Sequence, residues 1–261
     1  MRPNISEFSY GFALTSELVK APGGVTAAPV FPSLIAEGQA GGGWDVRLDR
    51  PGVPLFLQFK LCDKMTRRTC KEVRHADFNV PCYRMHLRPS RTSSQHEMLL
   101  DLEASGQEVF YTAPMFHQPE ELNAAFLDGA IRARSIWIKP SDIGPLPDDR
   151  DHHVSFELGS PWTLFSEPRQ LETKRTFEDV ATDLEERLRQ RGEVDLSRMN
   201  LESLADTISE ISEKSRDIGV RQLNMAREVA RQAAPLQRIA YYASVFLESQ
   251  LFIVQGRQQA A

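Results

Sequence analysis

Cysteine, long apolar runs and strong net charge are all scarce in this sequence. The 261 residues hold only three cysteines and carry a formal net charge of −5. An odd cysteine count, with an opening MRPNISEF that lacks an apolar leader core, favours reduced thiols in a cytoplasmic protein over a disulfide framework. The most apolar stretch, residues 239–254, is too short to cross a bilayer and contains Glu248, so we expect a buried helix there and no membrane span.

The sequence also lacks the usual patterns of nucleotide and zinc sites. The glycine-rich segment 38–43 is not followed by the GK[ST] of a phosphate-binding loop. The cysteines (Cys62, Cys70 and Cys82) form no CxxC pair, which argues against a zinc site shared with His75 and His86. A histidine pair follows aspartates in the loop 148–153, a pattern compatible with a metal site or with a solvated turn.

Positive charge is concentrated in one part of the chain. Residues 46–91 hold eleven Lys and Arg but only four Asp and Glu, a local charge of +7. Such a segment can follow a phosphate backbone, or it can be a solvated positive loop. The candidate nucleic-acid contacts are Lys64, Arg67, Arg68, Lys71 and Arg74.

Residues 41–63 predict two strands joined by a tight turn. Apolar and polar residues alternate over 44–49, the period of a half-buried strand. Arg50-Pro51-Gly52 supplies turn residues, and the more continuously apolar segment 53–61 predicts a central strand. Within it, Gln58 and Lys60 are two residues apart and therefore project from one face.

A lysine in a buried strand needs an anionic partner. Asp45, on the preceding strand, can supply one if the hairpin brings it beside Gln58. An acid, an amide oxygen and a lysine that converge would suit a Mg²⁺ ion held against a phosphate. This stretch is therefore the candidate site.

The pattern Asp45…Gln58-Phe59-Lys60 resembles the D…(D/E/Q)xK signature of the PD-(D/E)XK nuclease superfamily, in the QxK variant of Mrr-like restriction enzymes. The family's acid corresponds to Asp45, its second metal-side residue to Gln58 and its lysine to Lys60. Gln58 stands where the family usually has Glu or Asp, and no proline precedes Asp45. By the order of expected elements, the resemblance covers roughly residues 1–140.

The resemblance implies an α/β, restriction-endonuclease-like fold, with a mixed β-sheet core flanked by helices. It implies a metal-dependent endonuclease that hydrolyses phosphodiester bonds in DNA. Asp45 and Gln58 would hold Mg²⁺ (or Mn²⁺), and Lys60 would act on the attacking water and the scissile phosphate. Glu7 corresponds to a glutamate that the family's first helix often directs at the metal, and Glu37 is a further candidate acid.

Other interpretations stay open. Asp45 can be structural and Lys60 can extend its amine to solvent, while Glu7 can simply favour a helix N-terminus and Glu37 a strand end. Because Gln58 lowers the number of negative ligands, the second hypothesis is a nuclease-like fold that no longer cuts and instead binds nucleic acid or scaffolds a complex. The third is an RNase with the same site.

Apolar periodicity predicts a helix over 5–20 with Ser6 as N-cap and Phe8, Phe12, Leu14 and Leu18 on its apolar face. Further strands are expected at 30–37, 82–87, 108–115, 135–138 and 154–158. A second helix is expected at 94–103, where Gln95 faces either the site or solvent. A third is expected at 119–129, with Leu122, Ala125 and Phe126 facing inward.

The C-terminal part changes to helix-forming residues. Helices are expected at 176–191, 200–218 and 220–255, the last one split or kinked at Pro235. Leu201, Leu204, Ile208 and Ile211 form an a/d-like seam. We therefore predict a nuclease domain over 1–170 and a helical domain over 171–261 that oligomerises or docks on a protein partner. Such an arrangement resembles effectors of bacterial antiviral defence.

Overall fold

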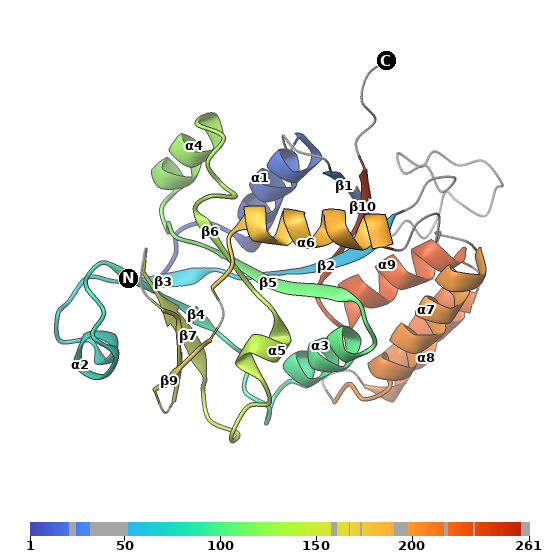
Figure 1. Ribbon diagram of the computed structural model, residues 1–261. Coiled ribbons are helices and arrows are strands. Elements are labelled where there is room, and N and C mark those ends of the chain that lie inside the picture. The colour runs from blue at the N-terminus through green and yellow to red at the C-terminus, as the bar shows by residue number, and fades with distance from the viewer. Residues whose placement is uncertain are drawn as a thin grey trace, which may run out of the picture. The chain divides into compact units, whose positions relative to one another are not determined.

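The computed structural model describes residues 1–20, 25–31, 52–157, 161–166, 168–172, 174–190, 198–216, 219–231 and 233–256. These residues form a mixed α/β fold with two β-sheets and nine helices (Figure 1), as the sequence predicts at the level of fold class. The restriction-endonuclease-like arrangement stays a prediction. Residues 32–51, which include Glu37, Asp45 and the expected strand at 44–49, lie outside the described residues.

The chain divides into two compact units, each made of three segments. The first unit comprises Met1–Glu17, Phe59–Thr92 and Phe110–Val180. The second comprises Leu18–Gln58, Ser93–Val109 and Ala181–Ala261. The C-terminal helices thus share a unit with the strands that precede Phe59, while the division into domains at residue 170 stays a prediction.

The first unit contains an antiparallel sheet with the strand order β3-β4-β7-β8-β9. Its strands are β3 (Cys62–Met65), β4 (Cys82–His86), β7 (His153–Phe156), β8 (Thr163–Phe165) and β9 (Arg169–Gln170). A second antiparallel pair joins β5 (Glu108–Pro114) and β6 (Ser135–Ile138). The helices are α1 (Glu7–Lys20, whose residues from Leu18 on belong to the second unit), α2 (Lys71–Ala76), α4 (Pro119–Leu127) and α5 (Pro140–Ile143).

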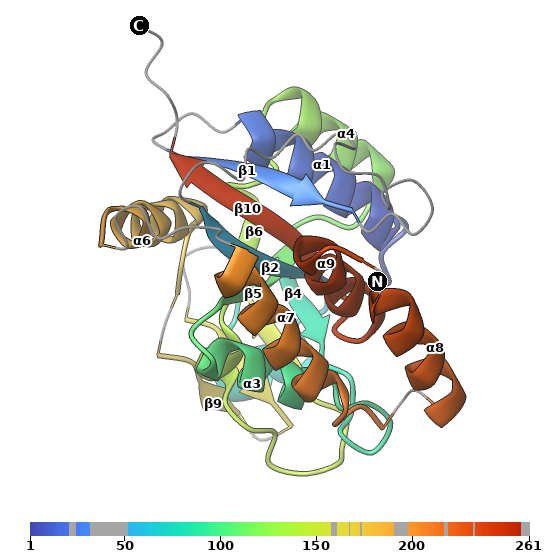
Figure 2. The same ribbon diagram turned by 90° about the vertical axis from the view of Figure 1, so that its right-hand side faces the viewer.

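The second unit contains three antiparallel strands in the order β1-β10-β2, visible in Figure 2. They are β1 (Val25–Val30), β10 (Gln250–Gly256) and β2 (Val53–Phe59, whose last residue belongs to the first unit). The helices are α3 (Gln95–Ala104), most of α6 (Phe177–Gln190), α7 (Arg198–Ser212), α8 (Val220–Arg231) and α9 (Pro235–Val245). The seam of α7 is buried, and this helix packs on α9 and α3.

The C-terminal end of the chain differs from the prediction. The break before Pro235 is confirmed, because α8 ends at Arg231 and Pro235 starts α9. The expected continuation of the helix to Gln255 is wrong, since Gln250–Gly256 forms β10 between β1 and β2. Leu251 to Val254 are all buried. A run that is apolar on every side has no period to distinguish a central strand from a buried helix.

The predicted apolar face of α1 is only half correct. Ser6 does cap the helix, because its Oγ accepts the Ser9 N–H at 3.0 Å, and Leu14 and Leu18 are buried. Phe8 and Phe12, in contrast, are 83% and 63% exposed. They line a groove of about 740 Å³ between α1 and α4, which lie side by side in Figures 1 and 2.

On α4, the prediction holds for Ala125, which is buried, and fails for Phe126, which is 38% exposed in the same groove. No helix among the described residues is long and apolar enough to cross a membrane.

Candidate active site

Gln58 lies near the end of β2 and is almost fully buried, with 2% of its surface exposed. Its side-chain oxygen Oε1 accepts hydrogen bonds from Gln95 Nε2 at 3.2 Å and from Ser249 Oγ at 3.4 Å. A carbonyl oxygen has two lone pairs, so two donors fix the orientation of the amide. The oxygen that the resemblance assigns to a metal is therefore held by protein donors.

Strand register explains how a C-terminal residue reaches Gln58. β10 runs antiparallel to β2 with Gln250 opposite Leu57. The preceding residue, Ser249, therefore falls opposite Gln58, and its side chain is buried there. This contact depends on the strand that the sequence did not predict.

Gln95 connects the same group of residues from α3. It is the first residue of that helix and is 3% exposed, so it faces the protein interior and not solvent. Besides Gln58, its Nε2 lies 3.2 Å from the Leu247 carbonyl oxygen and 3.2 Å from Glu248 Oε2. Of the two positions that the sequence left open for Gln95, the structure selects the one against Gln58.

The turn between α9 and β10 places Glu248. The Ser249 N–H donates to the carbonyl oxygen of Ala243, six residues earlier, at 2.9 Å. Glu248 precedes that donor and has φ of +50°, a left-handed conformation in which glycine is usual. Its side chain is exposed, and its carboxylate reaches Gln95.

Lys60 belongs to the first unit and is also buried, with 7% of its surface exposed. Its backbone N–H donates to the Thr112 carbonyl oxygen on β5 at 2.9 Å. The neighbouring Phe59 ring packs edge-on against Tyr10 of α1, with ring centroids 6.0 Å apart. The lysine is thus held in a packed environment, unlike a lysine that extends its amine into solvent.

The candidate acids are only partly described. Glu7 is exposed in the first turn of α1. Asp45 and Glu37 lie outside the described residues, so the carboxylates that the resemblance assigns to the metal side are not placed.

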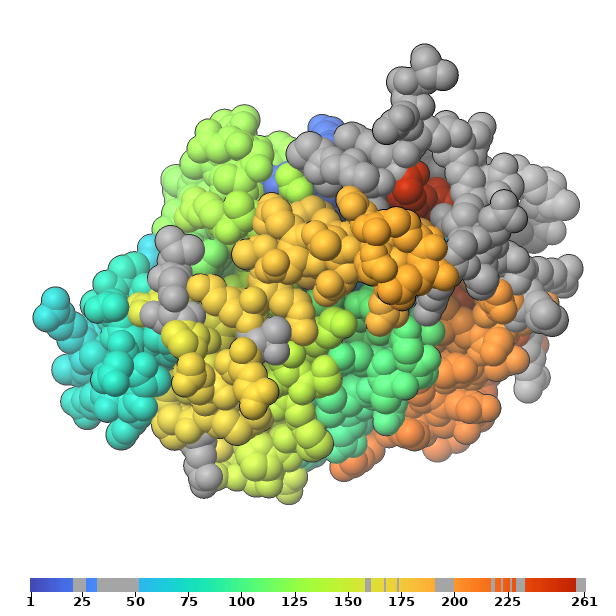
Figure 3. Space-filling view, in the orientation of Figure 1, coloured from blue at the N-terminus to red at the C-terminus, as the bar shows by residue number. Residues whose placement is uncertain are grey.

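The five candidate nucleic-acid contacts separate into two groups. Lys64 forms an ion pair with Glu121 at 2.9 Å, and Lys71 Nζ lies 5.2 Å from the centre of the Phe165 ring. The other three, the arginine triplet (Arg67, Arg68 and Arg74), are exposed. The segment that carries α2 lies at the molecular surface in Figure 3. The triplet is therefore the part of the segment most accessible to a phosphate backbone.

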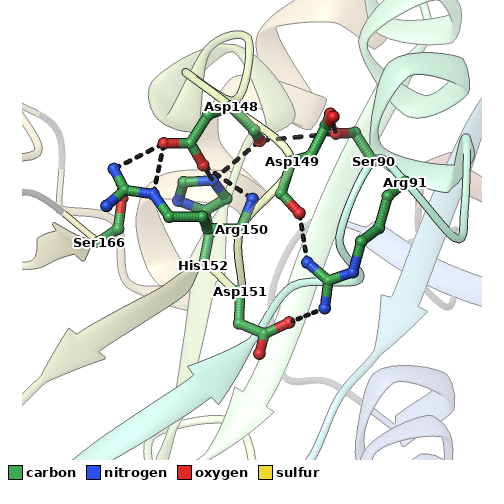
Figure 4. Close-up of polar contacts among 8 residues, drawn as sticks. All are labelled: Ser90, Arg91, Asp148, Asp149, Arg150, Asp151, His152 and Ser166. Carbon is green, nitrogen blue, oxygen red and sulfur yellow. Dashed lines mark hydrogen bonds and ion pairs between the residues drawn. The ribbon is translucent and has the colours of Figure 1, made fainter.

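The acidic loop 148–153 is organised by ion pairs, as Figure 4 shows. Asp148 Oδ2 lies 2.6 Å from Arg150, whose hydrogen bonds lower the pKa of that carboxyl to about 2. Asp151 pairs with Arg91 at 2.8 Å, and His152 Nε2 lies 3.1 Å from Asp148. Asp148 and Asp151 are thus each paired with an arginine of the same unit.

A buried polar cluster beneath α2 was not predicted from the sequence. Glu72 is fully buried, and its Oε1 lies 2.7 Å from Arg84 Nη2, 3.1 Å from Ser155 Oγ and 3.3 Å from His153 Nε2. Burial raises the pKa of Glu72, but the hydrogen bonds and the charge of Arg84 outweigh it, so the net pKa is lowered. No sequence pattern links these residues, which are as many as 83 positions apart.

The donor types around Gln58 fit a hard cation only in part. Gln58 Oε1 and the Glu248 carboxylate are oxygen donors of the kind that Mg²⁺ prefers. No group of three or more His, Cys, Asp or Glu residues suited to a metal occurs in the described part of the chain. Two of the candidate acids, Asp45 and Glu37, lie outside the described residues.

Comparison of the chain with protein-family models, with curated proteins and with solved structures finds no match.

Proposed function

We propose that this protein is a metal-dependent nuclease that hydrolyses phosphodiester bonds in DNA. The observation that carries the proposal is the burial of Lys60, two residues after the buried amide of Gln58. A buried ammonium group acts on a nearby phosphate with little screening by water, so its charge stabilises that phosphate more than a surface charge would.

The proposed reaction adds the oxygen of a water molecule to the phosphorus and breaks the bond to the leaving oxygen, which takes up a proton. Mg²⁺ or Mn²⁺ would be held by Gln58 and Asp45, with Glu37 or Glu7 completing the site, and would supply charge stabilisation at the phosphate. Lys60 would orient the water and offset negative charge on the phosphate. Gln95 and Ser249 hold the amide of Gln58 in place, and one of these two hydrogen bonds would give way when Gln58 Oε1 binds the metal.

The proposed partner is DNA, held mainly through its backbone by the arginine triplet. A second copy of the chain, or another protein, would dock on the C-terminal helices, where α8 exposes Val220 and Met225. We propose that the protein acts in the cytoplasm as an effector of antiviral defence.

One observation favours the second candidate, a nuclease-like fold that does not cut. Both lone pairs of Gln58 Oε1 are already used by Gln95 and Ser249, an arrangement that suits a structural amide. In that case the chain would bind nucleic acid or scaffold a complex without hydrolysis.

The test is a cleavage assay on linear, supercoiled and single-stranded DNA and on RNA, with Mg²⁺, with Mn²⁺ and with EDTA. We expect metal-dependent cleavage of DNA that is lost in Asp45→Ala. Cleavage of RNA alone would favour the RNase. Absence of cleavage, together with metal binding that is the same in wild type and Asp45→Ala, would overturn the enzyme and favour the non-cutting fold.

A further inference from the structure

Two of the three cysteines lie together in the first unit, and the proposed nuclease chemistry gives them no role. Cys82 begins β4 and is fully buried in a small apolar cluster with Phe78 and Phe165. Cys70, the residue before α2, is half-buried and packs against that cluster. The thiol of Cys82 makes a side-chain hydrogen bond with that of Cys70. Two sulfur atoms in such contact have only a short approach to the disulfide bond length of about 2.0 Å.

The register of β3 against β4 separates the third cysteine from this pair. Cys62 lies opposite Met85, whereas Cys82 lies opposite Met65. Three positions along a strand correspond to about 10 Å, and an odd separation places the two side chains on opposite faces of the sheet. A bond between Cys62 and Cys82 would therefore require the hairpin to rearrange, while Cys70 already touches Cys82.

The two thiols of the pair differ in their access to an oxidant. Cys70 is partly exposed, so a small oxidant in solvent can approach it. Burial, above all, raises the pKa of Cys82 to about 12, so this side chain stays a protonated thiol. A buried, protonated thiol is inert towards oxidants in solvent, because the thiolate is the reactive form. An accessible sulfur beside a protected one is the arrangement of a reactive cysteine with its resolving partner.

We propose that Cys70 and Cys82 form a reversible disulfide when a peroxide oxidises the protein. The Cys70 sulfur attacks one peroxide oxygen and the O–O bond breaks, which leaves a sulfenic acid and a hydroxide that takes the Cys70 proton to become water. The Cys82 sulfur then displaces the sulfenic hydroxyl group, which leaves with the Cys82 proton as a second water, and the S–S bond forms. The peroxide gains the two electrons that the thiols lose.

The disulfide would join the start of α2 to β4. The backbone of Cys70 donates to the Arg67 carbonyl oxygen at 3.1 Å and accepts from the Arg74 N–H at 3.3 Å. The new bond would therefore also hold the segment that carries the arginine triplet. It closes the loop 70–82 covalently, which restricts the opening of this segment.

The experiment is treatment of the full-length protein with hydrogen peroxide, followed by tryptic digestion and mass spectrometry without reduction. Trypsin cleaves after Lys and Arg, so the proposed disulfide links peptide 69–71 to peptide 75–84. Free thiols are counted under denaturing conditions before and after treatment, and dithiothreitol tests reversal. Cys70→Ser and Cys82→Ala each remove one partner. Cys62→Ala is the matched control, because it removes a buried thiol that lies outside the pair.

We expect wild type to lose two of its three free thiols and to yield the linked peptides, which dithiothreitol separates. Cys62→Ala should yield the same linked peptides. Cys70→Ser should keep both of its thiols, and Cys82→Ala should stop at a sulfenic acid on Cys70 that dimedone traps.

Three free thiols in treated wild type would overturn the proposal. Oxidation of Cys70 to a sulfinic acid without the linked peptides would overturn it too, and so would a disulfide between two copies of the chain, seen as a doubled mass, in place of the internal bond.

Discussion

The buried cluster beneath α2 makes the stability of the protein depend on pH through His153. This side chain is 3% exposed and stacks on Phe165, with ring centroids 5.3 Å apart. The pKa of His153 is lowered from 6.5 to about 4, mainly by burial. The positive charges of Lys71 and Arg84 add to this lowering, and the nearby Glu72 carboxylate opposes it. His153 is therefore neutral in the folded protein at neutral and mildly acidic pH.

The sign of the effect follows from which state binds the proton. In the unfolded chain a histidine with a pKa near 6.5 becomes protonated as the pH falls from 7 to 5, whereas folded His153, with a pKa of about 4, stays neutral. Stability is thus lost as the pH falls from about 6.5 towards 4. The two pKa values differ by about 2.5, so the free energy of unfolding should decrease by about 2 kcal/mol between pH 7 and pH 5 because of this residue.

The assay is urea unfolding at pH 7 and at pH 5 for wild type and for His153→Gln. Gln cannot titrate, so the decrease in unfolding free energy between the two pH values should be smaller by about 2 kcal/mol in the variant than in wild type. His75→Gln, at an exposed position of α2, is the matched control and should show the wild-type decrease. An equal decrease in His153→Gln and wild type would refute this account of the cluster.

Two further predictions concern α1 and the arginine triplet. A Cβ at Gly11 would lie 2.9 Å from the Phe59 ring, so Gly11→Ala should lower the unfolding free energy by about 1 kcal/mol, despite the helix preference of alanine. Gly219→Ala is the control, because a Cβ at Gly219 meets nothing within 4 Å and should not lower the unfolding free energy. Chemical denaturation measures both variants. Replacing all three triplet arginines with alanine should reduce the slope of log K against log salt for DNA binding by about 1 per residue, and an unchanged slope would exclude them from the interface.

Local patterns in the sequence predicted most elements that have a clear period or a clear cap. Ser6 caps α1, Pro235 begins a new helix, and the seam of α7 is buried as its spacing predicts. These features depend on residues within one or two turns of each other. The physical information needed to recognise them is therefore local.

Features set by distant contacts were not predictable in this way. Residues 250–256 form a strand because β1 and β2 offer hydrogen-bonding edges on both sides, which no pattern within the segment reveals. Phe8 and Phe12 follow a helical period but remain exposed, because periodicity does not show which face a neighbouring element covers.

The candidate site likewise combines features that the local sequence indicates with contacts that only the folded chain reveals. The sequence indicates Gln58 and Lys60 through their spacing, and the structure adds that both are buried. The contacts of Gln58 come from Gln95, 37 positions away, and Ser249, 191 positions away, so only the folded chain reveals them. The contact between Glu248 and Gln95 could not be predicted either, because Glu248 lies in a segment expected to be helical.

The central claim is that Lys60 serves phosphodiester hydrolysis. Its most direct test is the rate of metal-dependent DNA cleavage by Lys60→Ala, measured beside wild type and Lys174→Ala, a variant that removes an exposed lysine of the same unit. Circular dichroism should establish first that each variant is folded. The account predicts that cleavage by Lys60→Ala falls by a factor of about 100 or more, the size expected for a lost electrostatic or proton-transfer group, while Lys174→Ala cuts as wild type does. A folded Lys60→Ala protein that cuts DNA at the wild-type rate would contradict it.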